Sequence, residues 1–195
     1  MTEPEDPIAA EKAAARRAAF AARKQAHAEG GPAAAEAAAA AFLDAVPVGA
    51  GEIVSGYRPI RTEIDPTPLM TALIARGATL AVPVIEGPGL PLSFRVWTPE
   101  SRMIEGPFKA EIPADGATVE PTLLIAPLVA FDADFYRLGY GGGFYDRTLE
   151  RLRARRPTRA IGLAYAAQEV PAAPREPTDQ PLDGVATERG VRFRA

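Results

Sequence analysis

A glycine-rich stretch with flanking charges, RLGYGGGFYDR at residues 137–147, holds the residue types that could do chemistry in this chain. Four glycines lie beside charged and aromatic residues: Gly139, Gly141, Gly142, Gly143, Arg137, Tyr145, Asp146 and Arg147. Glycine allows backbone conformations and close ligand approaches that a Cβ would block. Because a turn needs one or two glycines, this combination predicts backbone N–H groups that hold a polyanion, and we expect a nucleotide phosphate site.

The stretch does not match the common nucleotide-binding motifs. A Walker loop requires Gly-Lys-Ser or Gly-Lys-Thr, and neither occurs. A dinucleotide fingerprint would need a glycine where Phe144 stands. The single histidine, His27, gives no credible Ser/His/Asp triad, and its place at the end of a helical pattern favours a capping role. The chain has no HExxH zinc motif and no cysteine, which excludes disulfides and thiolate nucleophiles.

Length and charge limit the remaining possibilities. The 195 residues, 47% of them hydrophobic, predict one domain with a sizeable core. The net charge of −3 argues against a generally basic nucleic-acid binder. The acidic first residues do not resemble a secretory signal, and no apolar run approaches the roughly 20 residues that cross a bilayer. We therefore predict a soluble, cytoplasmic protein with no membrane partner.

Two alanine-rich patterns predict helices at residues 9–28 and from Pro32 to Val46, and these could pack as a hairpin. Lys12 and Arg16 are four residues apart and share one face of the first helix. Taken alone, these two cations favour a solvated helix surface.

The rest of the chain alternates strand and helix patterns. We expect strands at 53–57, 78–85, 92–97, 122–132, 159–165 and 184–193, with helices at 66–76 and 143–155. The glycine-rich and proline-rich segment 86–121 predicts a functional flap around one strand, and the last strand is predicted to lie at an edge. The apolar run 122–132 predicts a central parallel strand, so the glycine stretch follows its carboxyl end, where open α/β sheets bind ligands.

Four segments together carry a resemblance to a known family: APLVAFD, RLGYGGGFYDR, GLAYAAQEVP and the terminal TERG. The chain resembles the 5-formyltetrahydrofolate cyclo-ligases, also called 5,10-methenyltetrahydrofolate synthetases. The resemblance implies a three-layer α/β/α, Rossmann-like single domain with a mostly parallel sheet over residues 1–195, of which 1–8 are expected to be flexible. It also implies ATP- and Mg²⁺-dependent closure of 5-formyltetrahydrofolate to 5,10-methenyltetrahydrofolate through a phosphorylated formyl group, with release of ADP and phosphate.

The resemblance further implies roles for individual residues. The expected catalytic residues are Arg137 and Tyr145. The expected ATP-binding residues are Lys12, Arg16, Arg137, Gly139, Gly141, Gly142, Gly143, Phe144 and Tyr145. The expected folate-binding residues are Tyr57, Glu63, Trp97 and Tyr145. The expected Mg²⁺ ligands are Asp146 and Asp179. Taken singly, Glu63 fits an ordinary loop acid and Asp146 a helix-start residue, so their joint occurrence in family order carries the assignment.

Two departures from the family pattern keep other functions open. Lys109 and Ile112 stand where the family usually has glycine and glutamate, and Thr178 stands where it usually has histidine before Asp179. A non-catalytic paralogue that binds folate or nucleotide is therefore an alternative to a monomeric enzyme acting on small molecules. A second alternative is RNA binding through the arginine-rich helix, although its arginines are not interleaved with exposed aromatic residues.

Overall fold

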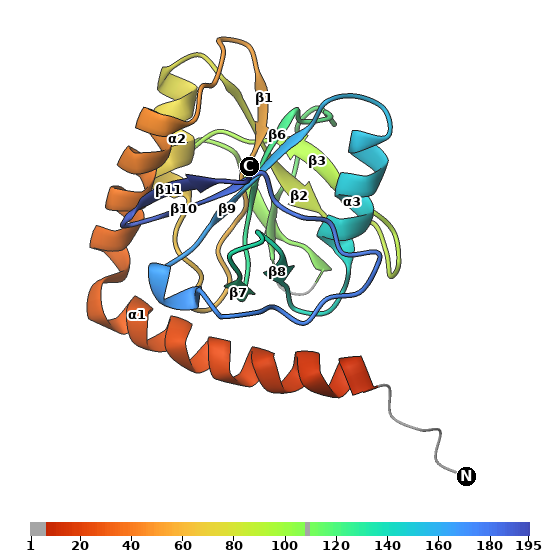
Figure 1. Cartoon of the computed structure of the whole chain (residues 1–195). Coiled ribbons are helices and arrows are strands. Elements are labelled where there is room, and N and C mark those ends of the chain that lie inside the picture. Colours follow the sequence, from red (N-terminus) through yellow and green to blue (C-terminus); the bar gives the residue numbers. More distant parts are fainter. Residues whose placement is uncertain (1–6, 108–109) are drawn as a thin grey trace.

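A seven-stranded, mostly parallel sheet forms the centre of the computed structural model, which describes residues 7–107 and 110–195 (Figure 1). The strand order is β11-β10-β9-β6-β1-β2-β3. These strands are β1 (Ile53–Ser55), β2 (Thr79–Val84), β3 (Ser93–Val96), β6 (Leu123–Ala126), β9 (Arg159–Leu163), β10 (Gly184–Thr187) and β11 (Gly190–Phe193). Only the two edge strands, β3 and β11, pair antiparallel to their neighbours within this sheet.

Helices cover both faces of the sheet, which confirms the predicted three-layer α/β fold. Alternate residues of β6 point to opposite sides: Leu123 and Ile125 pack in the core beneath α1 (Pro7–Ala45) and α2 (Thr67–Ala75). Leu124 and Ala126 pack in a second core beneath α3 (Phe144–Arg153). A fully buried strand with apolar residues on both faces is typical of a central parallel strand. Within the described residues, none of the helices has the length and apolar character to span a bilayer.

The two predicted amino-terminal helices form one kinked element, α1. Gly30 has non-helical backbone angles inside it, and Pro32 follows. Proline lacks an N–H group and its ring clashes with the carbonyl four residues earlier, which bends a helix at this point. Figure 1 shows the second segment turning away along the sheet, while the first runs beneath the β7–β8 hairpin. The predicted helical hairpin is therefore wrong.

The predicted central strand at 122–132 is shorter than its apolar pattern suggested. β6 ends at Ala126, because Pro127 has no N–H group to continue the ladder. The chain then forms a separate hairpin of β7 (Ala130–Phe131) and β8 (Arg137–Leu138). This hairpin carries the chain from the carboxyl end of β6 to the glycine stretch.

Three other predicted elements have different bounds. β1 ends at Ser55, so Tyr57 lies in the following loop rather than in the strand. The segment 86–121 holds β3 and a second hairpin, β4 (Met103–Glu105) with β5 (Glu111–Pro113). The carboxyl-terminal stretch is two strands, and β10 is internal, so only β11 is an edge. Lys109 and residues 1–6 lie outside the described residues, while Ile112 is buried in β5.

Candidate active site

The glycine stretch forms a loop between β8 and α3. Gly141 and Gly143 have positive φ values of 103° and 62°, which residues with a Cβ rarely adopt. Gly143 is also the N-cap residue of α3, and as a glycine it has no side chain to accept hydrogen bonds from the first N–H groups of the helix. The first-turn N–H groups of a helix lack intrahelical partners and carry positive partial charge. The loop geometry therefore supports the predicted anion site at the start of α3.

Helix α1 places three cationic side chains along this loop. Lys12, Arg16 and Arg23 are spaced at four and seven residues, which puts them on one helix face. Arg16 Nε donates to the Gly139 carbonyl at 2.9 Å, and Arg23 Nη2 donates to the Tyr140 hydroxyl at 2.7 Å. The helix expected to be a solvated surface on its residues alone thus faces the glycine loop.

Two cations near the loop, Lys12 and Arg137, form ion pairs with carboxylates. Lys12 Nζ contacts Asp179 at 2.8 Å and Glu176 at 2.7 Å. Burial alone would lower the pKa of Lys12, but hydrogen bonds and attraction from these two carboxylates outweigh it and raise the pKa. Arg137, itself buried, pairs with Asp146 at 2.9 Å.

The segment after Asp179 closes the arrangement. The N–H of Gln180 donates to Asp146 Oδ1 at 2.9 Å, and Arg137 donates to the Gln180 carbonyl at 2.9 Å. Both predicted metal ligands therefore lie near each other, with Asp146 joined to the residue that follows Asp179. The phosphate cluster is the group formed by Lys12, Arg16, Arg137, Gly139, Gly141, Gly142, Gly143, Asp146 and Asp179.

A second group surrounds Glu63, which is only 5% exposed. Its Oε2 accepts a hydrogen bond from the Ile60 N–H at 2.9 Å, and its Oε1 lies 3.9 Å from Arg23 Nη1. Burial raises the pKa of the Glu63 carboxyl to about 7, against the opposing effects of the Ile60 N–H, Arg23 and Tyr140. The carboxylate and the carboxylic acid are therefore both populated near neutral pH.

Two tyrosines complete this second group. Tyr57 is buried and its hydroxyl donates to the Ile64 carbonyl at 2.6 Å. The Tyr145 hydroxyl is buried without a hydrogen-bond partner in the described part of the chain. Burial and then the negative charge of Glu63 raise the pKa of Tyr145, with Arg137 opposing. We call Arg23, Tyr57, Glu63, Tyr140 and Tyr145 the Glu63 cluster.

Trp97, a predicted folate contact, is placed in the hydrophobic core. It is 4% exposed and packs in the same core as Tyr57. The Arg58 guanidinium lies 5.8 Å from its ring centroid and pairs with Glu111 of β5. A ligand that stacks on Trp97 would have to displace Arg58, so this contact stays a prediction.

The phosphate cluster contains two carboxylates, those of Asp146 and Asp179, that could bind Mg²⁺. Magnesium is held by one or two carboxylates together with substrate phosphates and water, rather than by a cage of protein ligands. The contacts of Asp146 both fall on Oδ1, and those of Asp179 both fall on Oδ2. Among the described residues no cluster of three or more acidic, histidine or cysteine ligands occurs. The two carboxylates fit a magnesium ion that is completed by phosphate oxygens.

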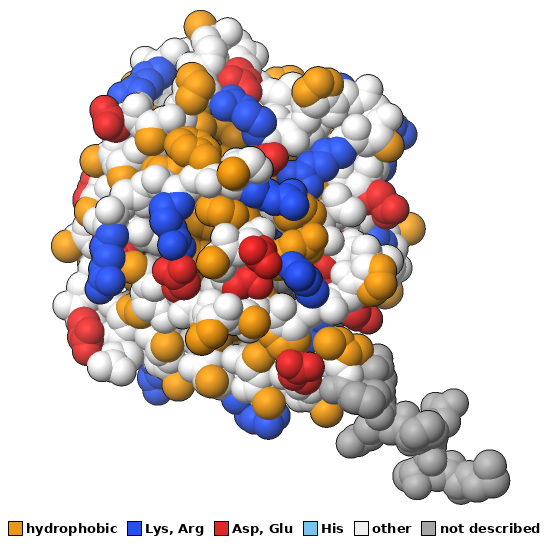
Figure 2. All heavy atoms as spheres, viewed as in Figure 1, with side chains coloured by type: hydrophobic (Ala, Val, Ile, Leu, Met, Phe, Trp, Pro, Cys, Tyr) orange, Lys and Arg blue, Asp and Glu red, His pale blue; other side chains and the backbone are white. Residues whose placement is uncertain are grey.

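The arginine-rich helix α3 is occupied by contacts within the protein. The arginines of α3 and of the turn that follows it reach main-chain carbonyls and carboxylates: Arg147 to Gly142, Arg151 to Leu92, Arg153 to Pro181 and Asp183, and, after the end of α3, Arg155 and Arg156 to Glu120. Figure 2 shows basic and acidic side chains interspersed over one face of the molecule. These pairings argue against RNA binding through this helix.

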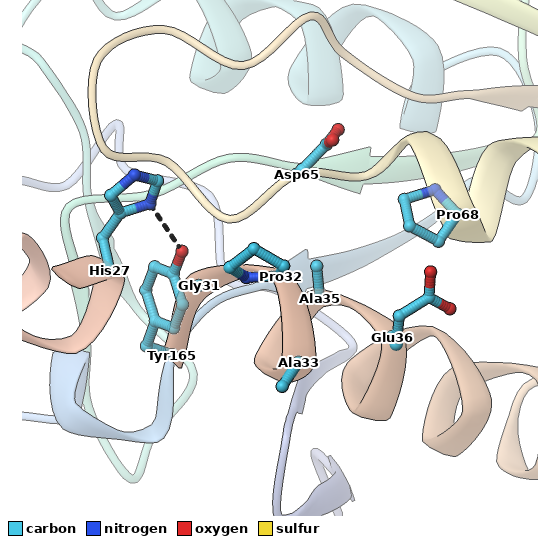
Figure 3. Close-up of a pocket in the computed structure, with 9 residues that line it drawn as sticks. All are labelled: His27, Gly31, Pro32, Ala33, Ala35, Glu36, Asp65, Pro68 and Tyr165. Carbon is cyan, nitrogen blue, oxygen red and sulfur yellow. Dashed lines mark hydrogen bonds between the residues drawn. The ribbon is translucent and has the colours of Figure 1, made fainter. Parts of the chain in front are cut away.

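A cavity of about 460 Å³ lies between the kink of α1, Asp65, Tyr165 and the start of α2 (Figure 3). None of the predicted site residues lines it. His27 lies three residues before the break at Gly30, and its Nδ1 is 3.0 Å from the Tyr165 hydroxyl; its capping role stays a prediction. The cavity is therefore separate from the residues that carry the candidate chemistry.

Two residues of the candidate site were missed from the sequence. Arg23 is 1% exposed and Tyr140 bonds to it, yet neither was predicted to have a role. The spacing of Arg23 from Lys12 and Arg16 on one helix face was the signal that could have found it. Asp132 was also missed: its carboxylate accepts the N–H groups of Asp134, Tyr136 and Ala173, and so holds the β7–β8 turn and the 173 loop together.

The fold and the two clusters define an α/β protein with a glycine-rich anion loop beyond a parallel sheet and a buried carboxylate with tyrosines beside it. A sequence model described as the 5-formyltetrahydrofolate cyclo-ligase family matches residues 8–188. The 5-formyltetrahydrofolate cyclo-ligase of Escherichia coli (strain K12) is 34% identical over 160 residues, which cover 77% of this chain and 85% of that protein.

Solved structures agree with the sequence comparisons. The NMR structure of Aquifex aeolicus 5,10-methenyltetrahydrofolate synthetase has a TM-score of 0.72 at 28% identity and covers 93% of this chain and 92% of that one. A Mycoplasma pneumoniae 5,10-methenyltetrahydrofolate synthetase, at 22% identity, shares the fold with a TM-score of 0.69 and covers 91% of this chain and 98% of that one. The chain belongs to the 5-formyltetrahydrofolate cyclo-ligase family, which confirms the resemblance and makes it an enzyme of the ligase class.

Proposed function

We propose that this chain closes 5-formyltetrahydrofolate to 5,10-methenyltetrahydrofolate in a reaction that consumes ATP and requires Mg²⁺. The observation that carries the proposal is the direct contact between two clusters suited to the two substrates. Arg137 pairs with Asp146 in the phosphate cluster and lies 5.8 Å from the ring of Tyr145 in the Glu63 cluster. A reaction between a phosphoryl group and a folate formyl group requires this adjacency.

The reaction needs activation of a poor leaving group. The formyl oxygen attacks the γ-phosphorus of ATP, the bond to the bridging oxygen breaks, and ADP leaves. N10 then attacks the formyl carbon and loses its proton, and the formyl oxygen departs with phosphate. Phosphoryl transfer depends mainly on positioning and on neutralisation of charge, so the chain needs no nucleophile of its own.

The phosphate cluster provides the positioning for this transfer. The N–H groups of the glycine loop and the side chains of Lys12, Arg16 and Arg137 would bind phosphate oxygens. When bound, Mg²⁺ neutralises charge on the phosphate oxygens, and Asp146 and Asp179 are the residues that would hold it. Binding therefore exchanges the ion pairs of Lys12 and Arg137 for contacts with the nucleotide.

The Glu63 cluster provides recognition of the folate ring. A carboxylate can accept hydrogen bonds from the amino and ring N–H groups of a pterin, and a buried one does so without competition from water. The unpartnered hydroxyl of Tyr145 would gain a hydrogen bond from the same ligand. Water is excluded here because Glu63 is buried before any ligand binds.

An absorbance assay tests the proposal. The purified protein, given 5-formyltetrahydrofolate, ATP and Mg²⁺, should develop the near-ultraviolet absorbance of the methenyl product and release ADP. Asp146→Ala should lower turnover by at least about a hundredfold while the chain stays folded. Glu150→Ala removes an exposed carboxylate one helical turn later and serves as the matched control.

Three outcomes are informative. Folded protein that forms neither product nor ADP would exclude the proposed reaction. Tight folate binding without turnover would favour the non-catalytic paralogue that the replacements at Ile112 and Thr178 suggest. Full activity of Asp146→Ala would remove the metal assignment. The cytoplasmic location and the monomeric state stay predictions.

A further inference from the structure

Arg23 is one of the largest fully buried side chains in the described part of the chain, with 1% of its surface exposed. Its Nε donates to the Thr62 hydroxyl at 3.2 Å and its Nη2 donates to the Tyr140 hydroxyl at 2.7 Å. Its Nη1 has no hydrogen-bond partner among the described residues. Burying a guanidinium costs free energy unless it is fully paired, so this arrangement calls for a physical reason.

The reason lies in the position of Glu63. Arg23 Nη1 is 3.9 Å from Glu63 Oε1, which is close enough for strong attraction at low dielectric but too long for a hydrogen bond. Tyr140 links the two residues by a second route, because its hydroxyl accepts from Arg23 and hydrogen-bonds to Glu63. The guanidinium therefore acts on the carboxylate without occupying the acceptor sites that a ligand would use.

We propose that Arg23 is a positioning residue of the folate site, which favours the ionised form of Glu63 and orients it, directly and through Tyr140, without making a hydrogen bond of its own to the carboxylate. This inference rests on the proposed function. Arg23 shares one face of α1 with Lys12 and Arg16, so a single helix carries both the proposed phosphate contacts and the residue that positions Glu63.

The groups that face Glu63 act in opposite directions. Burial disfavours the ionised form and raises the pKa of Glu63. The neighbouring side chains of Tyr57 and Tyr145 become anionic only at high pH, so neither supplies a positive charge that would stabilise the carboxylate. The Ile60 N–H, Arg23 and Tyr140 favour the ionised form and lower its pKa. Arg23 is the cation among these opposing influences, so its removal should raise the pKa of Glu63 above about 7.

The first experiment measures the charge of Glu63 in the free protein. The carboxyl carbon of Glu63 is titrated by carbon-13 NMR and assigned by its loss in Glu63→Gln. In Arg23→Gln the midpoint should move up by about one pH unit, and in Tyr140→Phe by a smaller amount in the same direction. Arg17→Gln, an exposed arginine on the same helix, is the matched control and should leave the midpoint unchanged.

The second experiment measures the effect on the reaction. The acid limb of the pH profile of kcat/KM for 5-formyltetrahydrofolate should shift upward in Arg23→Gln, with KM for the folate raised about fivefold or more at pH 7 and KM for ATP changed less than about twofold. Arg23→Lys, which keeps the charge but not the planar fork, should fall between Arg23→Gln and the unmodified chain. A defect that disappears at alkaline pH is not expected from a merely structural role.

The two experiments separate the possible failures. If Arg23→Gln does not fold, Tyr140→Phe carries the test, because Tyr140 is 40% exposed and the loss of its hydroxyl leaves no large void. Unshifted titration of Glu63 in both variants would overturn the role of Arg23, as would equal increases in both KM values. If the midpoint shifts in the variants but the unmodified protein forms no methenyl product, the proposed function is overturned, whereas the linkage of Arg23 to Glu63 stands.

Discussion

The phosphate cluster and the Glu63 cluster lie side by side but are prepared for their ligands in different ways. In the phosphate cluster the charges are already satisfied: Lys12 pairs with Asp179 and Glu176, and Arg137 pairs with Asp146. In the Glu63 cluster two buried polar atoms, Arg23 Nη1 and Tyr145 Oη, have no hydrogen-bond partner among the described residues.

This difference indicates how each ligand would bind. A nucleotide must replace existing ion pairs, so its net binding free energy is a difference between two similar sets of contacts and should fall with added salt. A folate ring would instead meet the carboxylate of Glu63, which is already buried, and would give the Tyr145 hydroxyl the partner it lacks, so the cost of desolvation is met before binding. Five substitutions test this comparison.

The largest effect is expected at Arg137, which joins the two clusters. Arg137→Ala removes the cation nearest to both Asp146 and Tyr145 and should lower kcat/KM by about a thousandfold, as loss of a charge-stabilising group in phosphoryl transfer does. Steady-state rates of methenyl formation measure it. Arg155→Ala, whose side chain is 61% exposed, is the control. A loss of less than tenfold would mean that the clusters do not work together.

The next effect is expected at Glu63. Glu63→Gln should raise KM for the folate by about tenfold to a hundredfold, because a neutral amide replaces a charged acceptor, with little change in KM for ATP. Equal changes in the two KM values would contradict the separation of the two clusters.

The same substitution, Glu63→Gln, should weaken folate binding but increase the stability of the folded chain at high pH. Since the pKa of Glu63 is raised from its ordinary value to about 7 in the folded chain, the stability tied to the protonated form is present below the ordinary value and lost as pH rises through about 7. Glu63→Gln should therefore be more stable than the unmodified chain at pH 8, by as much as about 3 kcal/mol, and equal to it at low pH. Denaturant unfolding at both pH values measures the difference.

A smaller effect is expected at Lys12. Lys12→Met should raise KM for ATP about tenfold and leave KM for the folate within about twofold, since the lost cation serves only the phosphate cluster. The increase should shrink at high salt, where the unmodified enzyme also binds ATP more weakly. Lys24→Met, an exposed lysine on the same helix, should have neither effect.

The smallest effect is expected from two tyrosines whose hydroxyls are buried, Tyr57 and Tyr145. Tyr57→Phe removes a hydrogen bond to the Ile64 carbonyl and should cost about 1 kcal/mol of unfolding free energy. Tyr145→Phe removes a hydroxyl that has no partner, so the free protein should keep its stability within about 0.5 kcal/mol. Only Tyr145→Phe should reduce the stabilisation gained on adding folate. Equal losses in the free protein would show that Tyr145 is already hydrogen-bonded.

The sequence predicted the layers of the fold well because they depend on local patterns. The continuous apolar run of β6, which packs on both faces of the sheet, and the helical spacing in α3 are set by neighbouring residues. The error at the end of β6 has a different origin. The apolar run continues past Pro127, and hydrophobicity alone does not show where a strand loses its ladder hydrogen bonds.

The candidate site was harder to predict, because its contacts join distant segments. Glu63, Tyr140 and Arg23 come from different parts of the chain, and only the folded structure shows that they meet. A charged residue within an alanine-rich helix is normally exposed, so local reasoning gave Arg23 no role in the site. The assignment of Asp146 and Glu63 rested on the family resemblance, since each has an ordinary structural explanation when considered alone.

The kink in α1 also divides that helix into parts that should open at different rates. The segment after Pro32 packs on the main core through Ala35, Ala38 and Phe42, whereas the first segment rests on a small core around Ala19 and on its polar contacts. Amide hydrogens before Gly30 should therefore exchange with solvent faster than those after Pro32. Ligands that engage Lys12, Arg16 and Glu63 would slow that exchange, so amide protection of one helical segment would report when the active site is filled.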